Sequence, residues 1–141
     1  MKITFFSEDV SFKLSSPNKI RRWIKEVIHL EKQTLSEISY IFCSDDYLHN
    51  MNVQYLNHDT LTDIITFDNS EQEELIEGDI FISVDRVKEN ATQLNLPFDT
   101  ELHRVMIHGI LHLCGYKDKT SADNELMRKK EDACLSLLPD L

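Results

Sequence analysis

The chain has 141 residues, of which 41% are hydrophobic, and its formal net charge is −10. That length suits one domain with a buried core, so we expect a single domain over residues 1–141. The negative charge argues against nonspecific binding to polyanions. The sequence contains neither a run of 18 apolar residues nor an apolar leader, so we expect a cytoplasmic protein without a membrane partner.

The N-terminal part alternates predicted strands and helices. β-branched and aromatic side chains predict a strand over residues 3–6, continued or paired through residues 10–14. Pro17 marks the start of a helix, and apolar residues follow at helical spacing as far as Ile28. One face of this helix should therefore pack on the sheet, with Trp23 in the core.

The middle of the chain should add three strands and one helix. Alternating apolar side chains predict a strand over residues 38–42, and Ser44 can cap the helix after it. The apolar spacing of that helix ends at Leu56, so Leu56 should pack in the protein. Two further strands are predicted over residues 64–67 and 79–84, with an acidic loop between them.

The C-terminal part should contain three helices. The first covers residues 85–94 and is ended by Pro97, the second covers about 100–114, and the third carries apolar pairs over residues 126–138. Apolar residues surround the second helix almost completely, which predicts a central buried position. This order of elements predicts an α/β (α+β) fold with a four-stranded mixed sheet surrounded by helices.

The central helix ends in the motif HGILHLCGYKD, which predicts a metal site. His108 and His112 are four residues apart, so on a helix both imidazoles project from one face. Gly115 can end the helix in a left-handed conformation, and the chain can then present Asp118. Two imidazoles, one carboxylate and one position left to water form the ligand set of a catalytic zinc site. We expect one Zn²⁺ per chain, although other divalent metals suit these ligands.

These residues resemble the YbeY-type metal-dependent endoribonucleases that act on ribosomal RNA. The family signature HGxLHLxGY is matched by residues 108–116, and residues 62–67, residues 78–83 and Glu101 agree with further segments of the family in the same order. The resemblance implies the same four-stranded architecture. It also implies cleavage of single-stranded RNA in 16S ribosomal RNA 3′ end maturation and in ribosome quality control, with the ribosome or ribosomal proteins as partners.

Two positions depart from the family pattern. The family usually continues GYDH with histidine as third ligand, whereas this chain has Lys117 and Asp118 at those positions. A carboxylate oxygen binds zinc at nearly the same distance as an imidazole nitrogen, so the site remains competent. The family commonly carries an arginine where this chain has Leu56, so a different group must stabilise phosphate charge here.

The catalytic residues are predicted to be His108, His112 and Asp63. Zinc makes hydroxide available near neutral pH and polarises phosphoryl oxygens, and hydrolysis of a phosphodiester needs both effects. Asp63 is a candidate base or charge stabiliser, with a turn or capping role as the alternative, and His58 is a weaker candidate. In His-Glu-x-x-His proteases a glutamate follows the first histidine, whereas Gly109 stands here, which makes peptidase activity less favoured.

Basic side chains near the motif can offset the negative net charge where RNA would bind. Lys117 and Lys119 bracket Asp118, and Arg128 follows on the last helix. We predict that Lys117, Lys119 and Arg128 bind substrate, with a solvated helix face as the alternative.

Two other functions stay open from the sequence. One is a metal hydrolase acting on a peptide or small amide, and the other is a non-catalytic ribosome-associated factor with a structural metal. The three cysteines lack a Cys-x-x-Cys spacing, so we expect neither a disulfide framework nor a thiolate zinc cage. The oligomeric state is left open.

Overall fold

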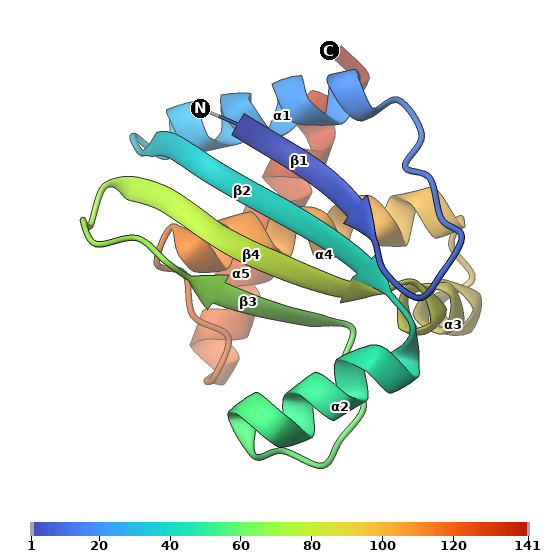
Figure 1. Ribbon diagram of the computed structural model, residues 1–141. Coiled ribbons are helices and arrows are strands. Elements are labelled where there is room, and N and C mark those ends of the chain that lie inside the picture. Colours follow the sequence, from blue (N-terminus) through green and yellow to red (C-terminus); the bar gives the residue numbers. More distant parts are fainter. Residues whose placement is uncertain (1, 141) are drawn as a thin grey trace.

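The computed structural model describes residues 2–140 and contains one mixed sheet with the strand order β1-β2-β4-β3 (Figure 1). The pairs β1–β2 and β2–β4 are parallel, and β3 runs antiparallel to β4. The predicted fold class is therefore confirmed. The strands are β1 (Lys2–Ser7), β2 (Thr34–Cys43), β3 (Ile64–Asp68) and β4 (Leu75–Ser83).

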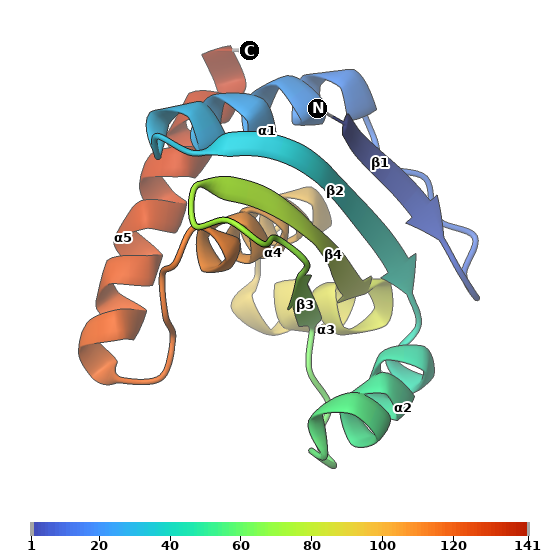
Figure 2. The same cartoon turned by 60° about the vertical axis from the view of Figure 1, so that its left-hand side comes forward.

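Helices pack on both faces of this sheet. Figures 1 and 2 show α1, α3, α4 and α5 on one face, while α2 lies at the end of the sheet near β3. The main core lies between the sheet and the first group of helices, and a smaller cluster under α2 includes Cys43, Leu48 and Ile65. The helices are α1 (Pro17–Leu30), α2 (Asp45–Leu56), α3 (Val84–Leu94), α4 (Phe98–Leu113) and α5 (Ser121–Leu137), followed by a 3₁₀ turn (Leu138–Asp140).

Helices α1 and α4 pack as their sequence spacing predicts. On α1, Trp23 is fully buried, as predicted, and its Nε1 donates to the Cys134 carbonyl oxygen of α5 at 2.8 Å. Helix α4 buries side chains nearly all round, which confirms its central position. No helix within residues 2–140 is long and apolar enough to cross a membrane.

Three local predictions were wrong. Residues 10–14 form no strand, because Phe12 instead turns into the core and packs edge-on against Phe42 with ring centroids 4.9 Å apart. The second and fourth strands begin earlier than predicted, since Thr34 pairs with Leu75, and the acidic loop is correspondingly shorter. Leu56 is 43% exposed, because it lies at the last turn of α2 beyond the part that the sheet covers.

Candidate active site

Helix α4 carries His108 and His112 one turn apart on the side that faces β3 and the loop before it. Gly109 lets the helix approach the sheet closely: a Cβ atom there would lie 3.0 Å from Ile64 Cδ1 and 3.1 Å from Ile80 Cδ1. A glutamate at this position would require the Ile64 and Ile80 side chains to move aside. The absence of a protease-type glutamate therefore has a steric reason as well as a chemical one.

Gly115 ends the helix as predicted. Its φ of +110° is a conformation that side-chain-bearing residues rarely adopt, and its N–H donates to the His112 carbonyl oxygen at 3.0 Å. The chain then reverses and places Asp118 Oδ2 3.4 Å from His108 Nε2. The turn therefore brings together two of the three predicted ligands.

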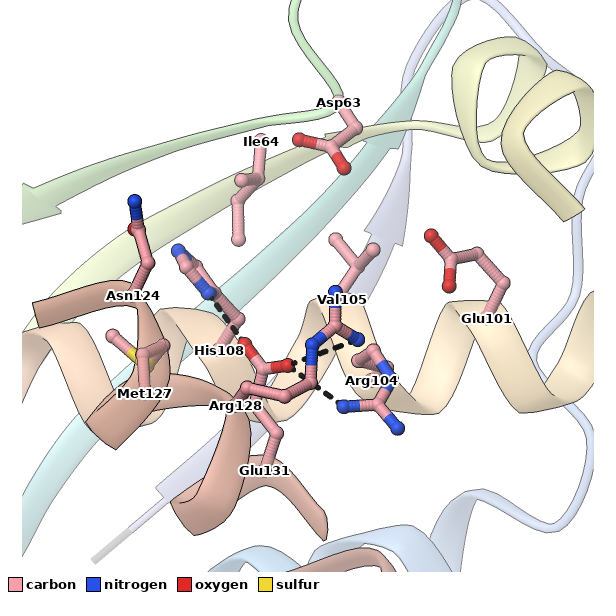
Figure 3. A pocket seen from close by; sticks show the side chains of 10 residues that line it. All are labelled: Asp63, Ile64, Glu101, Arg104, Val105, His108, Asn124, Met127, Arg128 and Glu131. Atoms are coloured by element: carbon pink, nitrogen blue, oxygen red, sulfur yellow. Dashed lines mark hydrogen bonds and ion pairs between the residues drawn. The ribbon is translucent and has the colours of Figure 1, made fainter. Parts of the chain in front are cut away.

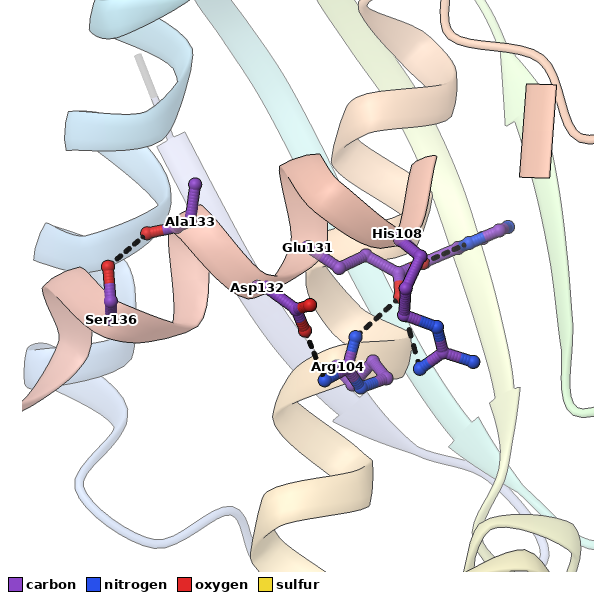
Figure 4. Close-up of polar contacts among 7 residues, drawn as sticks. Arg104, His108, Glu131, Asp132, Ala133 and Ser136 are labelled. Carbon is purple, nitrogen blue, oxygen red and sulfur yellow. Dashed lines mark hydrogen bonds and ion pairs between the residues drawn. The ribbon is translucent and has the colours of Figure 1, made fainter. Parts of the chain in front are cut away.

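Glu131 on α5 holds the other side of the His108 ring (Figure 4). Its Oε2 lies 2.8 Å from His108 Nδ1, and its Oε1 accepts a hydrogen bond of 2.9 Å from Arg104. Arg104 also donates to Asp132 at 2.7 Å, so both ends of the guanidinium are fixed to α5. A proton on Nδ1 of His108 is thus directed to Glu131, and Nε2 is left facing Asp118.

Sequence reasoning missed Glu131, although its position carried a signal. It is 5% exposed and lies between Met127 and Cys134, the other two buried residues of α5. A charged residue in the core-facing register of an amphipathic helix requires a buried partner. Here the partners are a histidine of the predicted site and the neighbouring Arg104.

The pKa values of the pair reflect this contact. Burial by itself would lower the pKa of His108, but the hydrogen bond and charge of Glu131, together with Asp118, outweigh burial and raise the pKa. Burial by itself would raise the pKa of Glu131, but the hydrogen bonds from His108 and Arg104 keep its pKa below the usual range. A metal ion at Nε2 would compete with a proton for this nitrogen, so the metal affinity should increase with pH.

Two neighbouring cavities meet at His108. The larger, called the main cleft, has a volume of about 470 Å³ and is lined by residues that include Leu56, His58, His112 and Asp118. The smaller, called the side cavity, has a volume of about 290 Å³ and is lined on its polar side by Asp63, Glu101, Arg104, Asn124, Arg128 and Glu131 (Figure 3). Ile64 and His108 line both, so the two spaces are adjacent.

The donor set of the main cleft fits a hydrolytic metal in its chemistry. His108, His112 and Asp118 all line this cleft, and the orientation of His108 leaves Nε2 available. Within residues 2–140, no three His, Cys, Asp or Glu side chains are placed closely enough to hold an ion as they stand. Binding by these three residues would therefore require side-chain rotation, for which the exposed His112 and Asp118 have room.

The other predicted residues surround these cavities. Asp63 lies in the side cavity rather than the main cleft, and burial raises the pKa of its carboxyl group although His108 lowers it. Lys117 and Lys119 are exposed on the loop beside Asp118. Arg128 has a 62% exposed side chain, and its Nη1 lies 3.8 Å from Glu131 Oε1.

The cysteine thiols do not have the properties of nucleophiles. Burial raises the pKa of Cys43 and of Cys114 to about 12 and that of Cys134 to about 11, so each thiol stays protonated near neutral pH. All three are free cysteines. A covalent mechanism through Cys114, which follows the two predicted histidine ligands, is therefore not supported.

Comparison with known proteins assigns the chain to a family. A family model described as Endoribonuclease YbeY matches residues 3–139. Proteins named Endoribonuclease YbeY from Cytophaga hutchinsonii and Flavobacterium johnsoniae are 56% and 53% identical; the alignments cover 96% and 94% of this chain and 94% of each relative. The solution structure of TM1509 from Thermotoga maritima superposes with a TM-score of 0.68 at 26% identity, over 96% of this chain and 88% of that one. The fold, the histidine motif and these matches agree, and the chain belongs to the endoribonuclease YbeY family.

Proposed function

We propose that this protein is a zinc-dependent endoribonuclease that cleaves single-stranded ribosomal RNA, with one ion held by His108, His112 and Asp118. Family membership supports an endoribonuclease, which is a hydrolase of phosphodiester bonds. The metal, the RNA class and the biological process are the proposal.

The orientation of His108 carries the proposal. Its Nδ1 is bound to the buried Glu131 at 2.8 Å, and its Nε2 faces Asp118 across 3.4 Å at the edge of the main cleft. A carboxylate on the far nitrogen of a metal-binding histidine is the usual outer partner in zinc enzymes, where it sets the tautomer and increases ligand basicity. Nε2 is therefore the His108 nitrogen that an ion at the edge of the cleft would bind, with Asp118 beside it.

The chemistry would be divided between the metal and the protein side chains. Zinc would lower the pKa of a water molecule and polarise a phosphoryl oxygen. Asp63, which lines the cavity next to His108, would accept the proton of the attacking water. Lys117, Lys119 and Arg128 would bind phosphates of the strand, taking the place of the arginine that this chain lacks at Leu56.

The proposed substrate is the 3′ end region of 16S ribosomal RNA, during its maturation and during ribosome quality control. A net charge of −10 weakens binding to RNA at long range, so the few basic residues near the cleft must act locally or a ribosomal protein must help to dock the enzyme. Work on the ribosome would place the protein in the cytoplasm.

Metal content and cleavage test this proposal together. Elemental analysis would be made on the wild type, on His112→Ala and on the control His29→Ala, whose histidine is exposed on α1. Each protein would then be incubated with ribosomal RNA carrying a single-stranded 3′ extension, with and without chelator, and with a peptide and a small amide.

The expected result is near-stoichiometric zinc and RNA cleavage in the wild type and His29→Ala, with both lost in His112→Ala and cleavage lost with chelator. Cleavage of the peptide or amide alone would overturn the proposal in favour of another hydrolase. Bound metal without any cleavage, combined with unfolding on metal removal, would indicate a ribosome-associated factor with a structural ion.

A further inference from the structure

The side cavity contains a buried acceptor that the proposed chemistry does not use. Glu101, on the first turn of α4, is 6% exposed and lines this cavity. Its Oε1 is buried and has no hydrogen-bond partner among the described residues. Figure 3 shows the Glu101 and Asp63 carboxylates facing the same space without an interaction between them. Burying a carboxylate oxygen without a hydrogen-bond donor costs free energy, and a ligand that donates to this oxygen would remove that cost.

We propose that the side cavity binds one base of the RNA strand and selects guanine through the Glu101 carboxylate. This inference rests on the proposed endoribonuclease function and names a specificity-determining residue for it. The ligand class follows from the lining of the cavity, its position relative to the main cleft, and the hydrogen-bonding groups that it offers.

The lining suits a flat heterocycle. Ile64, Val105 and Met127 supply apolar walls, and the carboxylate of Glu101 supplies an acceptor that the proposed chemistry leaves free. Such a combination of apolar walls and a few converging polar groups is typical of small-molecule sites, and about 290 Å³ is close to the lower end of their size range. The half-exposed or exposed groups at the rim, such as Arg128, could contact the sugar-phosphate backbone.

The position of the cavity connects the base to the site of cleavage. His108 and Ile64 form part of both the side cavity and the main cleft. A nucleotide whose base lies against Ile64 in the side cavity would therefore place its phosphate on the His108 side, where the metal ligands are. Reading of an unstacked base by its Watson–Crick edge next to the reacting group is a known means of selection in nucleic-acid enzymes.

The choice of guanine follows from donor geometry. Guanine presents two adjacent N–H groups, N1–H and N2–H, which match the two oxygens of one carboxylate. Burial, and then the nearby Asp63 carboxylate, raise the pKa of Glu101, and a pair of N–H donors on the ligand would favour its ionised form. Adenine and cytosine present an N–H beside a ring nitrogen lone pair, and uracil presents an N–H between two carbonyl groups, so each would direct a lone pair at that ionised form. A carboxylate therefore discriminates by repulsion as well as by attraction.

A second divalent cation is the competing occupant, and the surrounding charges disfavour it. Arg104 and Arg128 line the same cavity, and Arg104 is fixed there by Glu131 and Asp132. Positive side chains and separated acceptors fit an RNA strand better than a metal ion.

The test measures binding of labelled ten-nucleotide RNAs by fluorescence anisotropy, in chelator so that no strand is cut. The probes are all-uridine RNA and the same RNA with one central guanosine or one central inosine, which lacks the N2 amine. The proteins are the full-length wild type, Glu101→Gln and Glu26→Gln, which makes the same charge change on the exposed face of α1. Thermal melting confirms that each variant folds. A separate titration with Mn²⁺, without chelator and without RNA, tests whether the cavity binds a cation.

The expected result is that the wild type and Glu26→Gln bind the guanosine probe about tenfold more tightly than the uridine probe, within the range for a bidentate side chain–base pair. Inosine should lose much of this preference, and Glu101→Gln should lose it while binding uridine RNA as before. The inosine comparison needs no protein variant. It therefore tests whether the N2 amine of guanine is recognised even if Glu101→Gln does not fold.

Equal affinity for guanosine and uridine probes would overturn the guanine site while leaving the endoribonuclease proposal intact, provided that the wild type binds and, with metal, cleaves both. If Glu101→Gln lost a Mn²⁺ site without a change in base preference, the proposed guanine site would be wrong and the side cavity would be a cation site. Failure to bind or cleave any RNA would overturn the proposed function and the base site together.

Discussion

The two walls of the main cleft differ in how firmly their side chains are held. On the helix wall, formed by α4, His108 is held from behind by Glu131 of α5 at 2.8 Å, and Glu131 in turn accepts a hydrogen bond of 2.9 Å from Arg104. On the loop wall, residues 56–61, every residue is exposed. Its anchors include the Asn52 Nδ2 bond of 2.9 Å to the Thr60 carbonyl oxygen, the His58 N–H bond of 3.1 Å to the Asn52 carbonyl oxygen and an exposed His49–Asp59 pair.

This difference suits the two walls to different tasks: the helix wall to holding metal ligands and the loop wall to contacting RNA. Metal ligands must be held close to one geometry, and rigid helices with fixed partners do this better than loops. A wall with few buried contacts opens locally at a low free-energy cost and can adjust to an RNA strand. Substitutions on the helix wall should therefore have large effects on the metal, and substitutions on the loop wall should have smaller effects on RNA alone.

The largest effect is expected at Asp118. Asp118→Asn replaces an anionic ligand with a neutral amide, so zinc affinity should decrease more than about a hundredfold, beyond the usual loss for an outer partner. Asp118→His restores the ligand usual in the family and should keep the metal. Competition titration with a chromogenic zinc chelator would measure both. Unchanged affinity in Asp118→Asn would remove Asp118 from the ligand set.

Glu131→Gln tests whether the helix wall positions His108. The neutral side chain is a weaker acceptor for the imidazole N–H, so zinc affinity should decrease about 10- to 100-fold. Nitrogen NMR of the metal-free imidazole should also show a changed tautomer mixture, which a merely structural role would leave as it is. Glu125→Gln, exposed on the same helix, is the control. Identical spectra and affinity in Glu131→Gln would mean that Glu131 does not position His108.

Gly115→Ala tests the turn that joins the helix wall to Asp118. A Cβ atom at this position would meet nothing within 4 Å, so any cost must come from the backbone φ of +110°. We expect a loss of about 1–3 kcal/mol of unfolding free energy, seen as a decrease of several degrees in Tm by calorimetry. A melting temperature equal to that of the wild type would show that the turn readjusts without strain.

The smallest effect is expected on the loop wall. Leu56→Arg places a positive charge in the main cleft, so RNA affinity should increase a few-fold at low salt, with a salt dependence steeper by roughly one phosphate contact. Val53→Arg is a matched control, because both residues of α2 are 43% exposed but Val53 does not line the cleft. If both variants changed the affinity equally, the effect would be one of net charge alone.

Much of the architecture could be predicted because it depends on local patterns. The 3.6-residue spacing of α1 places Trp23 in the core, and Gly115 marks the end of α4, as the structure confirms. Strand limits were less certain, because Thr34 and Leu75 belong to strands only through pairing with each other. The packing of Phe12 on Phe42 likewise depends on a neighbour thirty positions away in the sequence.

In the candidate site too, some features follow from local sequence patterns and others depend on tertiary packing. Spacing along one segment was enough to identify the family motif, the helix that carries His108 and His112, and the glycine that turns the chain toward Asp118. Only the tertiary structure brought Glu131 to His108 and separated Asp63 and Glu101 into a side cavity. Those contacts join residues on different elements, and their distances are set by how helices and sheet pack, which residue spacing alone does not specify.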